Sequence, residues 1–360
     1  MNIRKTILAF TTLACLASCG APASSSQETT TVEESGSTST IMKYKNPIIE
    51  VDCPDPAVVR EGSSLYVFGT GGRTYRIDDW EEGPIQLPDV LRSNSWGASP
   101  TNIWAPDVYK IGDTWNYYYS NSVWGGEDTA GIGVMTSKSL EGPWIDKGKI
   151  FDSQEIGVAN SIDPVVIQEN GHVYMAWGSF RGLFIVELND DGTALKNPST
   201  AAQDKVLIAG IVGNWNGGTY EGSYIRKIGE YFYYFGSQGT CCASGNSTYH
   251  VKVARSKSIF GPYVDSKGVD MLGENRGELV IKGDQNVAGP GHMSLVQDDN
   301  SDWWMFYHGY DKSNLTLGRV VFMDKLQWDD NGFPYVVSRK PSYGKSLAAP
   351  VLNGKCACYK

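Results

Sequence analysis

One aromatic strand pattern occurs five times along the chain, and no other feature constrains the fold as strongly. Each copy is a short run rich in Tyr, Trp and Phe that follows a turn at Gly or Asp, and a shorter apolar strand precedes each turn. The five runs are 65–69, 115–119, 173–177, 231–235 and 303–307. A hairpin repeated at long, regular intervals is typical of architectures in which neighbouring units bury one another's faces.

Each repeat is long enough for four antiparallel strands, and five such sheets around an axis form a β-propeller. We therefore predict an all-β fold, a five-bladed β-propeller. A β-sandwich is the alternative, but sandwiches rarely show so long and regular a unit. The 20 Tyr, 11 Trp, 11 Phe and 41 Gly suit many short aromatic strands joined by tight turns. No long apolar period of 3.6 is visible, so little helix is expected.

The start of the chain has the layout of a bacterial export signal. Arg4 and Lys5 precede an apolar run that ends at Ala17 and is too short to span a bilayer as a helix. The small residues before Cys19 look like a lipobox, so we expect a lipid on Cys19 that anchors an exported lipoprotein at the cell surface or in the periplasm. An ordinary signal peptide cut nearby is the alternative.

The rest of the chain divides by composition. Ser, Thr, Ala, Glu and Gly dominate the segment after Cys19, and such a segment buries too little apolar surface to offset the entropy lost on ordering. We predict a lipoprotein signal peptide at 1–19, a disordered Ser/Thr-rich tether at 20–42, a five-bladed propeller domain at 43–345 and a C-terminal tail at 346–360. We expect the protein to be a monomer.

Charge and cysteine content narrow the partners. The whole chain carries a net charge of −9, and the signal removes basic residues only, so the mature body is more acidic still. A nucleic-acid partner is therefore not expected, and a neutral substrate fits better than a polyanion. Without Cys15 and Cys19, five cysteines remain of the seven. An odd number argues against a full disulfide framework, none of the spacings suits zinc, and the pairing stays open.

The repeat also sorts the polar residues. The five units can be aligned on the residue that ends each first strand, which is Arg60, Lys110, Gln168, Arg226 or Gln297. Five positions upstream stand Asp55, Ala105, Asp163, Glu221 and His292. First strands line the channel of a propeller, so we expect these five residues to converge at one mouth. Singly, an Asp before a Pro is most often a turn residue. Together, closely spaced carboxylates cost free energy unless function requires them.

Such a ring could hydrolyse a glycosidic bond. Two carboxyl groups across a gap suffice, because one protonates the leaving oxygen while the other activates water or attacks the sugar. A third acid nearby can raise the pKa of the proton donor. Asp55, Asp163 and Glu221 supply that number, but their spacing does not assign the roles. The adjoining aromatic residues either stack on sugar rings or belong to the blade core; they are Trp104, Phe180, Trp215 and Tyr220.

From about Asn46 to Val337 the chain resembles the arabinanase branch of glycoside hydrolase family 43. The matching segments are 53–57 (CPDPA), 104–107 (WAPD), 160–164 (NSIDP), 220–223 (YEGS), 241–242 (CC), 247–249 (STY), 254–263 (ARSKSIFGPY) and 289–292 (GPGH). The resemblance implies an inverting five-bladed propeller enzyme that cleaves α-1,5-linked L-arabinan, and we expect endo action. The alternatives are an exo-acting arabinosidase, a β-xylosidase and a non-catalytic carbohydrate-binding propeller.

The resemblance also implies roles for single residues. Asp55 matches the general base, Glu221 the general acid, and Asp163 the residue that modulates the pKa of the acid and orients it. His292 matches a histidine beside a metal, usually calcium, in the axial channel. Calcium prefers oxygen ligands, so one imidazole with water would be an unusual site. One departure is Ser223, where many relatives have Pro; it leaves the acid intact and the subsite details open.

Overall fold

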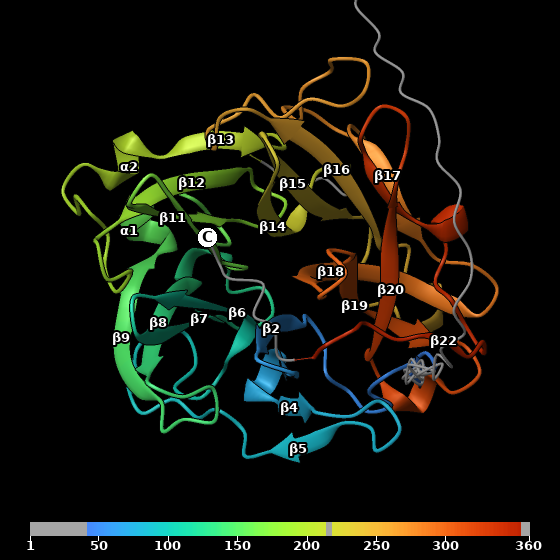
Figure 1. The fold of residues 1–360 in the computed structure, drawn as a ribbon. Coiled ribbons are helices and arrows are strands. Elements are labelled where there is room, and N and C mark those ends of the chain that lie inside the picture. The colour runs from blue at the N-terminus through green and yellow to red at the C-terminus, as the bar shows by residue number, and fades with distance from the viewer. Residues whose placement is uncertain (1–41, 214–217, 354–360) are drawn as a thin grey trace, which may run out of the picture. The chain divides into compact units, whose positions relative to one another are not determined.

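The structure is a computed structural model that describes residues 42–213 and 218–353. The chain divides into two units, 1–40 and 41–360, and the description that follows concerns the second. Its described residues form five four-stranded sheets and one two-stranded sheet. The five sheets surround a central axis (Figure 1). The prediction of an all-β, five-bladed β-propeller is confirmed, and the β-sandwich alternative was wrong.

Each blade is an antiparallel meander whose strand order follows the chain. Blade 1 contains β2 (Ala57–Glu61), β3 (Ser64–Phe68), β4 (Thr74–Ile77) and β5 (Ile85–Leu87). Blade 2 contains β6 (Trp104–Ile111), β7 (Thr114–Asn121), β8 (Gly131–Ser137) and β9 (Ile145–Asp152). Blade 3 contains β10 (Val165–Glu169), β11 (His172–Trp177), β12 (Leu183–Leu188) and β13 (Val206–Ala209). Blade 4 contains β14 (Glu221–Ile228), β15 (Tyr231–Gln238), β16 (His250–Ser256) and β17 (Glu278–Lys282). Blade 5 contains β18 (Val287–Gln297), β19 (Trp303–Asp311), β20 (Val320–Trp328) and β21 (Pro334–Val336).

The helices of the described residues are short. The α-helices are α1 (Ser153–Ile156) and α2 (Ala201–Asp204). Single 3-10 turns are η1 (Thr70–Gly72), η2 (Glu127–Thr129), η3 (Ser244–Asn246), η4 (Leu315–Leu317) and η5 (Val337–Arg339). None of the described helices is long and apolar enough to cross a membrane. The predicted signal peptide, most of the predicted tether and Cys19 lie outside the described residues.

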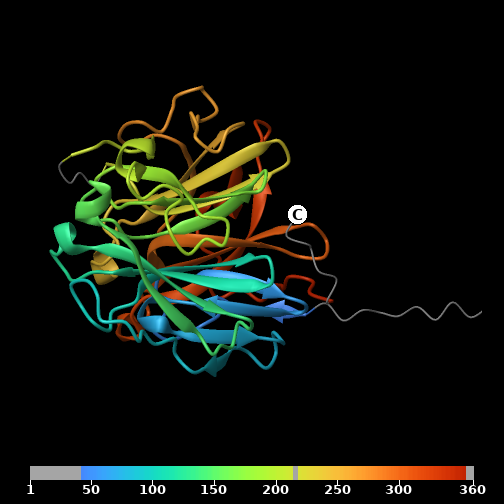
Figure 2. The ribbon, with the colours of Figure 1, turned by 90° about the vertical axis from the view of Figure 1, so that its left-hand side faces the viewer.

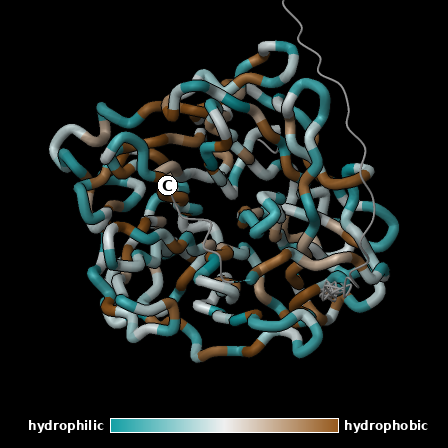
Figure 3. The backbone as a smooth tube through the Cα atoms, viewed as in Figure 1, coloured by the Kyte–Doolittle hydropathy of each residue, from teal (hydrophilic) through white to brown (hydrophobic). Residues whose placement is uncertain are grey.

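The aromatic runs of the repeat form the second strand of every blade. In β7 the consecutive residues Tyr117, Tyr118 and Tyr119 are all fully buried, because both faces of a blade pack against neighbouring blades. The hydrophobic residues accordingly form one cluster between each pair of adjacent blades. Hydrophobic stretches follow the blades while many rim loops are hydrophilic (Figure 3). Burying a large apolar side chain contributes about 1.5–3 kcal/mol, so these interfaces dominate stability.

The first and last blades meet at a seam that the two ends of the propeller close. Strand β1 (Lys43–Tyr44) pairs with β22 (Leu347–Ala348). The side chain of Asn46 donates to the Met323 carbonyl at 2.7 Å and accepts from the Met323 N–H at 2.8 Å. A buried ion pair joins Arg60 to Asp299 at 2.6 Å. In the view turned by 90°, strands of the first and last blades run side by side along the axis (Figure 2).

The end of the propeller lies further along the chain than the predicted boundary at 345. Residues 347–348 form β22, which pairs with β1. Beyond it, the Val351 carbonyl accepts from the Asp299 N–H at 2.9 Å, and the Asn353 N–H donates to the Asp299 carboxylate at 2.6 Å. Residues 347–353 of the predicted tail therefore pack against the propeller, because they bond to the segment before blade 1 and to the β18–β19 turn of blade 5.

Candidate active site

The ring residues share a strained backbone conformation. In each blade, the residue two positions before the uninterrupted paired segment of the inner strand has a positive φ. These residues are Asp55 (59°), Ala105 (37°), Asp163 (60°), Gly222 (57°) and His292 (49°). A residue other than Gly in this region is uncommon and costs about 1–3 kcal/mol, and such strain collects at functional sites.

The prediction that Glu221 occupies the ring position was wrong by one residue. Strand pairing in blade 4 places Lys227 opposite Phe232, as Arg60 lies opposite Leu65, so Lys227 rather than Arg226 ends the equivalent strand segment. The ring position of blade 4 is therefore Gly222. An ideal Cβ at Gly222 would lie 3.0 Å from Nδ1 of His292, so any other residue here would have to shift the His292 ring. Glu221 is the residue before Gly222, and its side chain lines the pocket.

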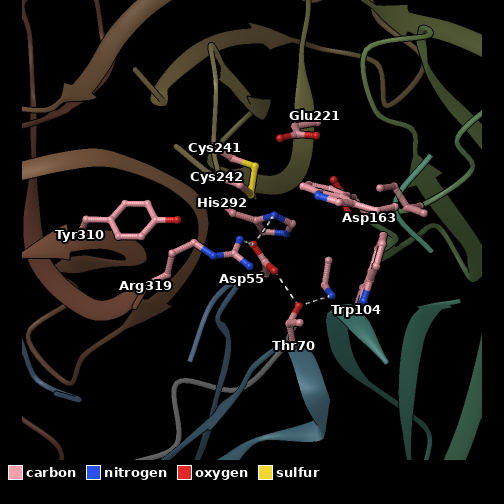
Figure 4. Close-up of a pocket in the computed structure, with 13 residues that line it drawn as sticks. Asp55, Thr70, Trp104, Asp163, Glu221, Cys241, Cys242, His292, Tyr310 and Arg319 are labelled. Atoms are coloured by element: carbon pink, nitrogen blue, oxygen red, sulfur yellow. Dashed lines mark hydrogen bonds and ion pairs between the residues drawn. A yellow bond between two sulfur atoms is a disulfide. The ribbon is translucent and has the colours of Figure 1, made fainter. Parts of the chain in front are cut away.

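The three carboxylates nevertheless meet in one pocket of about 310 Å³. Of the residues predicted to converge or to stack on sugar, the pocket is lined by Asp55, Trp104, Ala105, Asp163, Glu221 and His292. The other lining residues are Thr70, Trp124, Ile162, Cys241, Cys242, Tyr310 and Arg319. Figure 4 shows Asp55, Asp163 and Glu221 around one opening with His292 among them.

Asp55 is held as an anion. Its carboxylate accepts from the Thr70 hydroxyl at 2.6 Å and from the Arg319 guanidinium at 3.1 Å (Figure 4). Nδ1 of His308 lies 3.2 Å and Nδ1 of His292 lies 3.4 Å from the same carboxylate oxygen. Burial on its own would raise the pKa of Asp55, but the positive charge of the Arg319 guanidinium holds that pKa well below its usual value. Asp55 is therefore ready to accept a proton from water.

Glu221 has the opposite electrostatics. Its carboxyl group accepts from the Ser179 hydroxyl at 2.7 Å and hydrogen-bonds Tyr249. Burial, opposed by these two hydrogen bonds, and the negative charge of Asp55 raise the pKa of Glu221 to about 7. Glu221 therefore keeps a proton that it can donate up to a higher pH than an ordinary carboxyl group does.

Asp163 connects the two halves of the pocket. Its carboxylate accepts from the Gly222 N–H at 3.0 Å, so it holds the backbone next to Glu221. Burial and the negative charges of Glu221 and Asp55 raise the pKa of Asp163 well above its usual value. Because two buried carboxyl groups in one site disfavour double ionisation, Asp163 and Glu221 together retain at least one proton to a higher pH than two isolated carboxyl groups would.

The aromatic predictions had mixed outcomes. Trp104 lines the pocket, but Tyr220 is 0% exposed and does not, so its predicted stacking role was wrong: its ring packs in the core between blades 3 and 4. Phe180 is 7% exposed and is absent from the described lining. Trp215 lies outside the described residues. Sequence reasoning missed Trp124, which is 79% exposed and lies edge-on to Trp104 at 6.0 Å.

Comparison with known proteins decides the family. The family model described as "Glycosyl hydrolases family 43" matches residues 44–334. The chain belongs to glycoside hydrolase family 43. It is 33% identical to the extracellular exo-α-(1→5)-L-arabinofuranosidase of Cellvibrio japonicus, over 80% of this chain and 87% of that protein. It is 31% identical to the extracellular endo-α-(1→5)-L-arabinanase 1 of Bacillus subtilis, over 78% and 86%.

Solved structures agree with this family 43 assignment. The α-L-arabinanase of Cellvibrio cellulosa, determined in complex with arabinohexaose, superposes with a TM-score of 0.71 at 33% identity. That match covers 79% of this chain and 95% of the solved chain. An exo-1,5-α-L-arabinanase from a bovine ruminal metagenomic library gives 0.70 at 32% identity, over 79% and 96%. Relatives named for endo and for exo action are thus both similar to this chain.

Several pocket residues of this family 43 chain could not be found from strand positions alone. Cys241 and Cys242 form a disulfide between adjacent residues in the pocket wall, whereas Cys53 is buried and free. Cys356 and Cys358 lie outside the described residues. Arg319 is the residue immediately before β20, the third strand of blade 5, and lies far along the sequence from the motif that carries Asp55. Asp107, whose carboxylate accepts from the Val166 N–H at 2.8 Å, ties blade 2 to blade 3.

Proposed function

We propose that this family 43 protein is an inverting glycosidase that hydrolyses α-1,5-linked L-arabinan. The observation that carries the proposal is the pair of opposite pKa shifts in one pocket, well below the usual value for Asp55 and to about 7 for Glu221. Environments that separate the pKa values of two carboxyl groups mark one as the base and the other as the acid.

In the proposed reaction, Asp55 is the general base and Glu221 the general acid. Asp55 takes a proton from water as the water oxygen attacks the anomeric carbon from one face of the sugar. Glu221 gives its proton to the departing glycosidic oxygen on the other face, so the bond breaks with inversion. Asp163 acts through Glu221, because it fixes the Gly222 backbone and opposes ionisation of the acid. Arg319 and Thr70 orient Asp55.

Neutral furanose rings fit the remaining surface of the pocket. Trp104 and Trp124 offer apolar faces beside the carboxylates, and aromatic faces suit the C–H side of a sugar ring. The names of these relatives concern α-1,5-arabinan or its fragments. We propose endo action; exo action is the second candidate, because the Cellvibrio japonicus relative is named for it.

Product analysis tests the substrate and the mode of attack together. The mature protein is incubated with debranched linear arabinan and, separately, with xylan, and the products are resolved by length. A ladder of arabino-oligosaccharides supports endo action, and a single short product supports exo action. Products from xylan alone would favour a β-xylosidase, and no product from either polymer would favour a carbohydrate-binding propeller.

The raised pKa of Glu221 predicts the basic limb of the pH profile. The acid works only while protonated, so kcat should fall as the pH rises through about 7. The low pKa of Asp55 places the acidic limb below the usual range of a carboxyl group. Initial rates at saturating arabinan from about pH 4 to about pH 9 check this, with circular dichroism at each pH as the folding control. A kcat that stays flat or rises above pH 7 in the folded protein contradicts the assignment.

We further propose that the protein is exported and carries a lipid on Cys19. The lipobox-like sequence supports the lipid, and the extracellular relatives support export. Expressed with radiolabelled palmitate, the full chain should incorporate label and sediment with membranes. Cys19→Ser should lose both properties, whereas the matched control Cys15→Ser, within the signal itself, should keep them. Label retained by Cys19→Ser contradicts the proposal.

Calcium beside His292 stays a prediction. Within 42–213 and 218–353, no group of three or more His, Cys, Asp or Glu side chains could hold a metal. Nδ1 of His292 faces Asp55 at 3.4 Å, so Nε2 is the atom left to bind an ion, with water as the other ligands. A bound Ca²⁺ would add positive charge near the general base. Elemental analysis of the purified protein tests for it.

A further inference from the structure

The backbone N–H groups of the ring residues each donate to a side chain of the preceding blade, and the type of acceptor differs at the seam between blades 5 and 1. Three of them donate to a hydroxyl group on the preceding blade. Ala105 donates to Thr70 at 2.8 Å, Asp163 to Ser120 at 2.9 Å, and His292 to Ser237 at 2.8 Å. In blade 4 the Gly222 N–H goes to Asp163. At the seam, the Asp55 N–H donates to Nδ1 of His308, on the second strand of blade 5, at 3.0 Å.

Burial and ring stacking fix the position of His308. It is 0% exposed, and its ring stacks on Tyr249 with the centroids 5.7 Å apart and the planes 12° from parallel. Because Nδ1 accepts the Asp55 N–H, the ring proton lies on Nε2, which has no hydrogen-bond partner among the described residues. Tyr249 in turn hydrogen-bonds Glu221. One stacked pair of rings thus joins the backbone of Asp55 to the carboxyl group of Glu221.

We propose that His308 is a positioning residue for Asp55, which it holds in place by accepting the Asp55 N–H across the seam between the last blade and the first. This inference rests on the proposed role of Asp55 as general base. Asp55 has a φ of 59°, and a strained residue keeps such a conformation only when its surroundings enforce it. Without the acceptor, the buried N–H would lack a partner, and the backbone would relax towards another conformation.

Removal of the His308 acceptor should therefore lower kcat and leave substrate binding nearly unchanged. Displacing a catalytic group by about 1 Å can cost about 10²-fold in rate. The aromatic faces and the other carboxylates stay in place, so substrate affinity should change little. A residue needed only for packing would instead affect stability in proportion to the volume removed.

Two amide variants separate the acceptor from the packing. In His308→Asn, Oδ1 can take the place of Nδ1; in His308→Gln, the amide reaches one atom further, towards the place of Nε2. Both keep a polar side chain of intermediate size. We expect His308→Asn to retain kcat on linear arabinan to within about tenfold, and His308→Gln to lose about 10²-fold, with KM nearly unchanged in both. Thermal unfolding of both variants accompanies the kinetics.

Equal kcat values for the two variants, or a change confined to KM, would overturn the inference. If neither variant folds, exchange of the Asp55 N–H with deuterium in the wild-type protein keeps it testable. A protected N–H supports the His308 acceptor, and rapid exchange contradicts it. Absence of arabinan hydrolysis by the wild-type protein would instead contradict the proposed function and is visible before any variant is made.

Discussion

Exchanging Glu221 for Gln should lower kcat on linear arabinan by about 10³-fold, within the range of about 10²–10⁴ that general acid catalysis contributes. Gln keeps the shape and can still accept from the Ser179 hydroxyl, but it has no proton to give to the leaving oxygen. Stability should not fall. Because the pKa of Glu221 is raised on folding, its ionised form destabilises the folded protein above the unfolded pKa, and Gln removes that effect.

Steady-state kinetics and thermal unfolding at about pH 8 measure both effects. Glu169→Gln is the matched control, because Glu169 pairs with Lys227 at 2.6 Å at the opposite end of the inner strand and lies outside the pocket. It should keep kcat. A Glu221→Gln variant that folds and retains kcat to within about tenfold of the wild type contradicts the role of general acid.

Exchanging Asp55 for Asn should also lower kcat by about 10³-fold, but for a different reason and with a different effect on stability. Asn cannot take the proton of the attacking water. It also replaces the anion that balances the buried Arg319 guanidinium, with which Asp55 forms a 3.1 Å ion pair. The free energy of unfolding should therefore fall, by about 1–3 kcal/mol. Loss of activity thus accompanies destabilisation for Asp55 and not for Glu221.

Denaturant unfolding and kinetics on the same preparation measure this contrast. Asp299→Asn is the control, because it breaks the buried Arg60–Asp299 pair at the same seam but lies outside the pocket. It should lose stability and keep most of its kcat when folded. If Asp55→Asn loses stability while kcat stays high, Asp55 only stabilises the seam between the first and last blades, and its assignment as general base is wrong.

The fold could be predicted because its signal is local. An aromatic strand such as 115–119 must bury both faces, and five copies of one hairpin can do so only against one another. The converging carboxylates followed from the same register. In blade 4 the alignment was wrong by one residue, because the equivalent position is Gly222 and not Glu221. The glycine itself was the sequence signal, since a positive φ favours this residue type.

The rest of the site depends on contacts that no local pattern encodes. Arg319 and His308 reach Asp55 across 264 and 253 residues of sequence, and only closure of the ring brings them together. Tyr220 lies immediately before β14, and its place next to Glu221 in the sequence does not tell whether its ring faces the pocket or the core, so its predicted role was wrong. Trp124 lies in the loop between β7 and β8, outside the repeated hairpin pattern. Only its exposure in the structure distinguishes it from the core aromatic residues.

Proton NMR of linear arabinan during hydrolysis by the mature protein tests the central claim most directly. Cleavage and the configuration of the new reducing end are read in one experiment, before the anomers equilibrate. With Asp55 as base and Glu221 as acid, the signal of the β-anomer should appear first, because inversion converts the α-linkage. An α-anomer formed first, or an arabinan spectrum that does not change, would contradict the account.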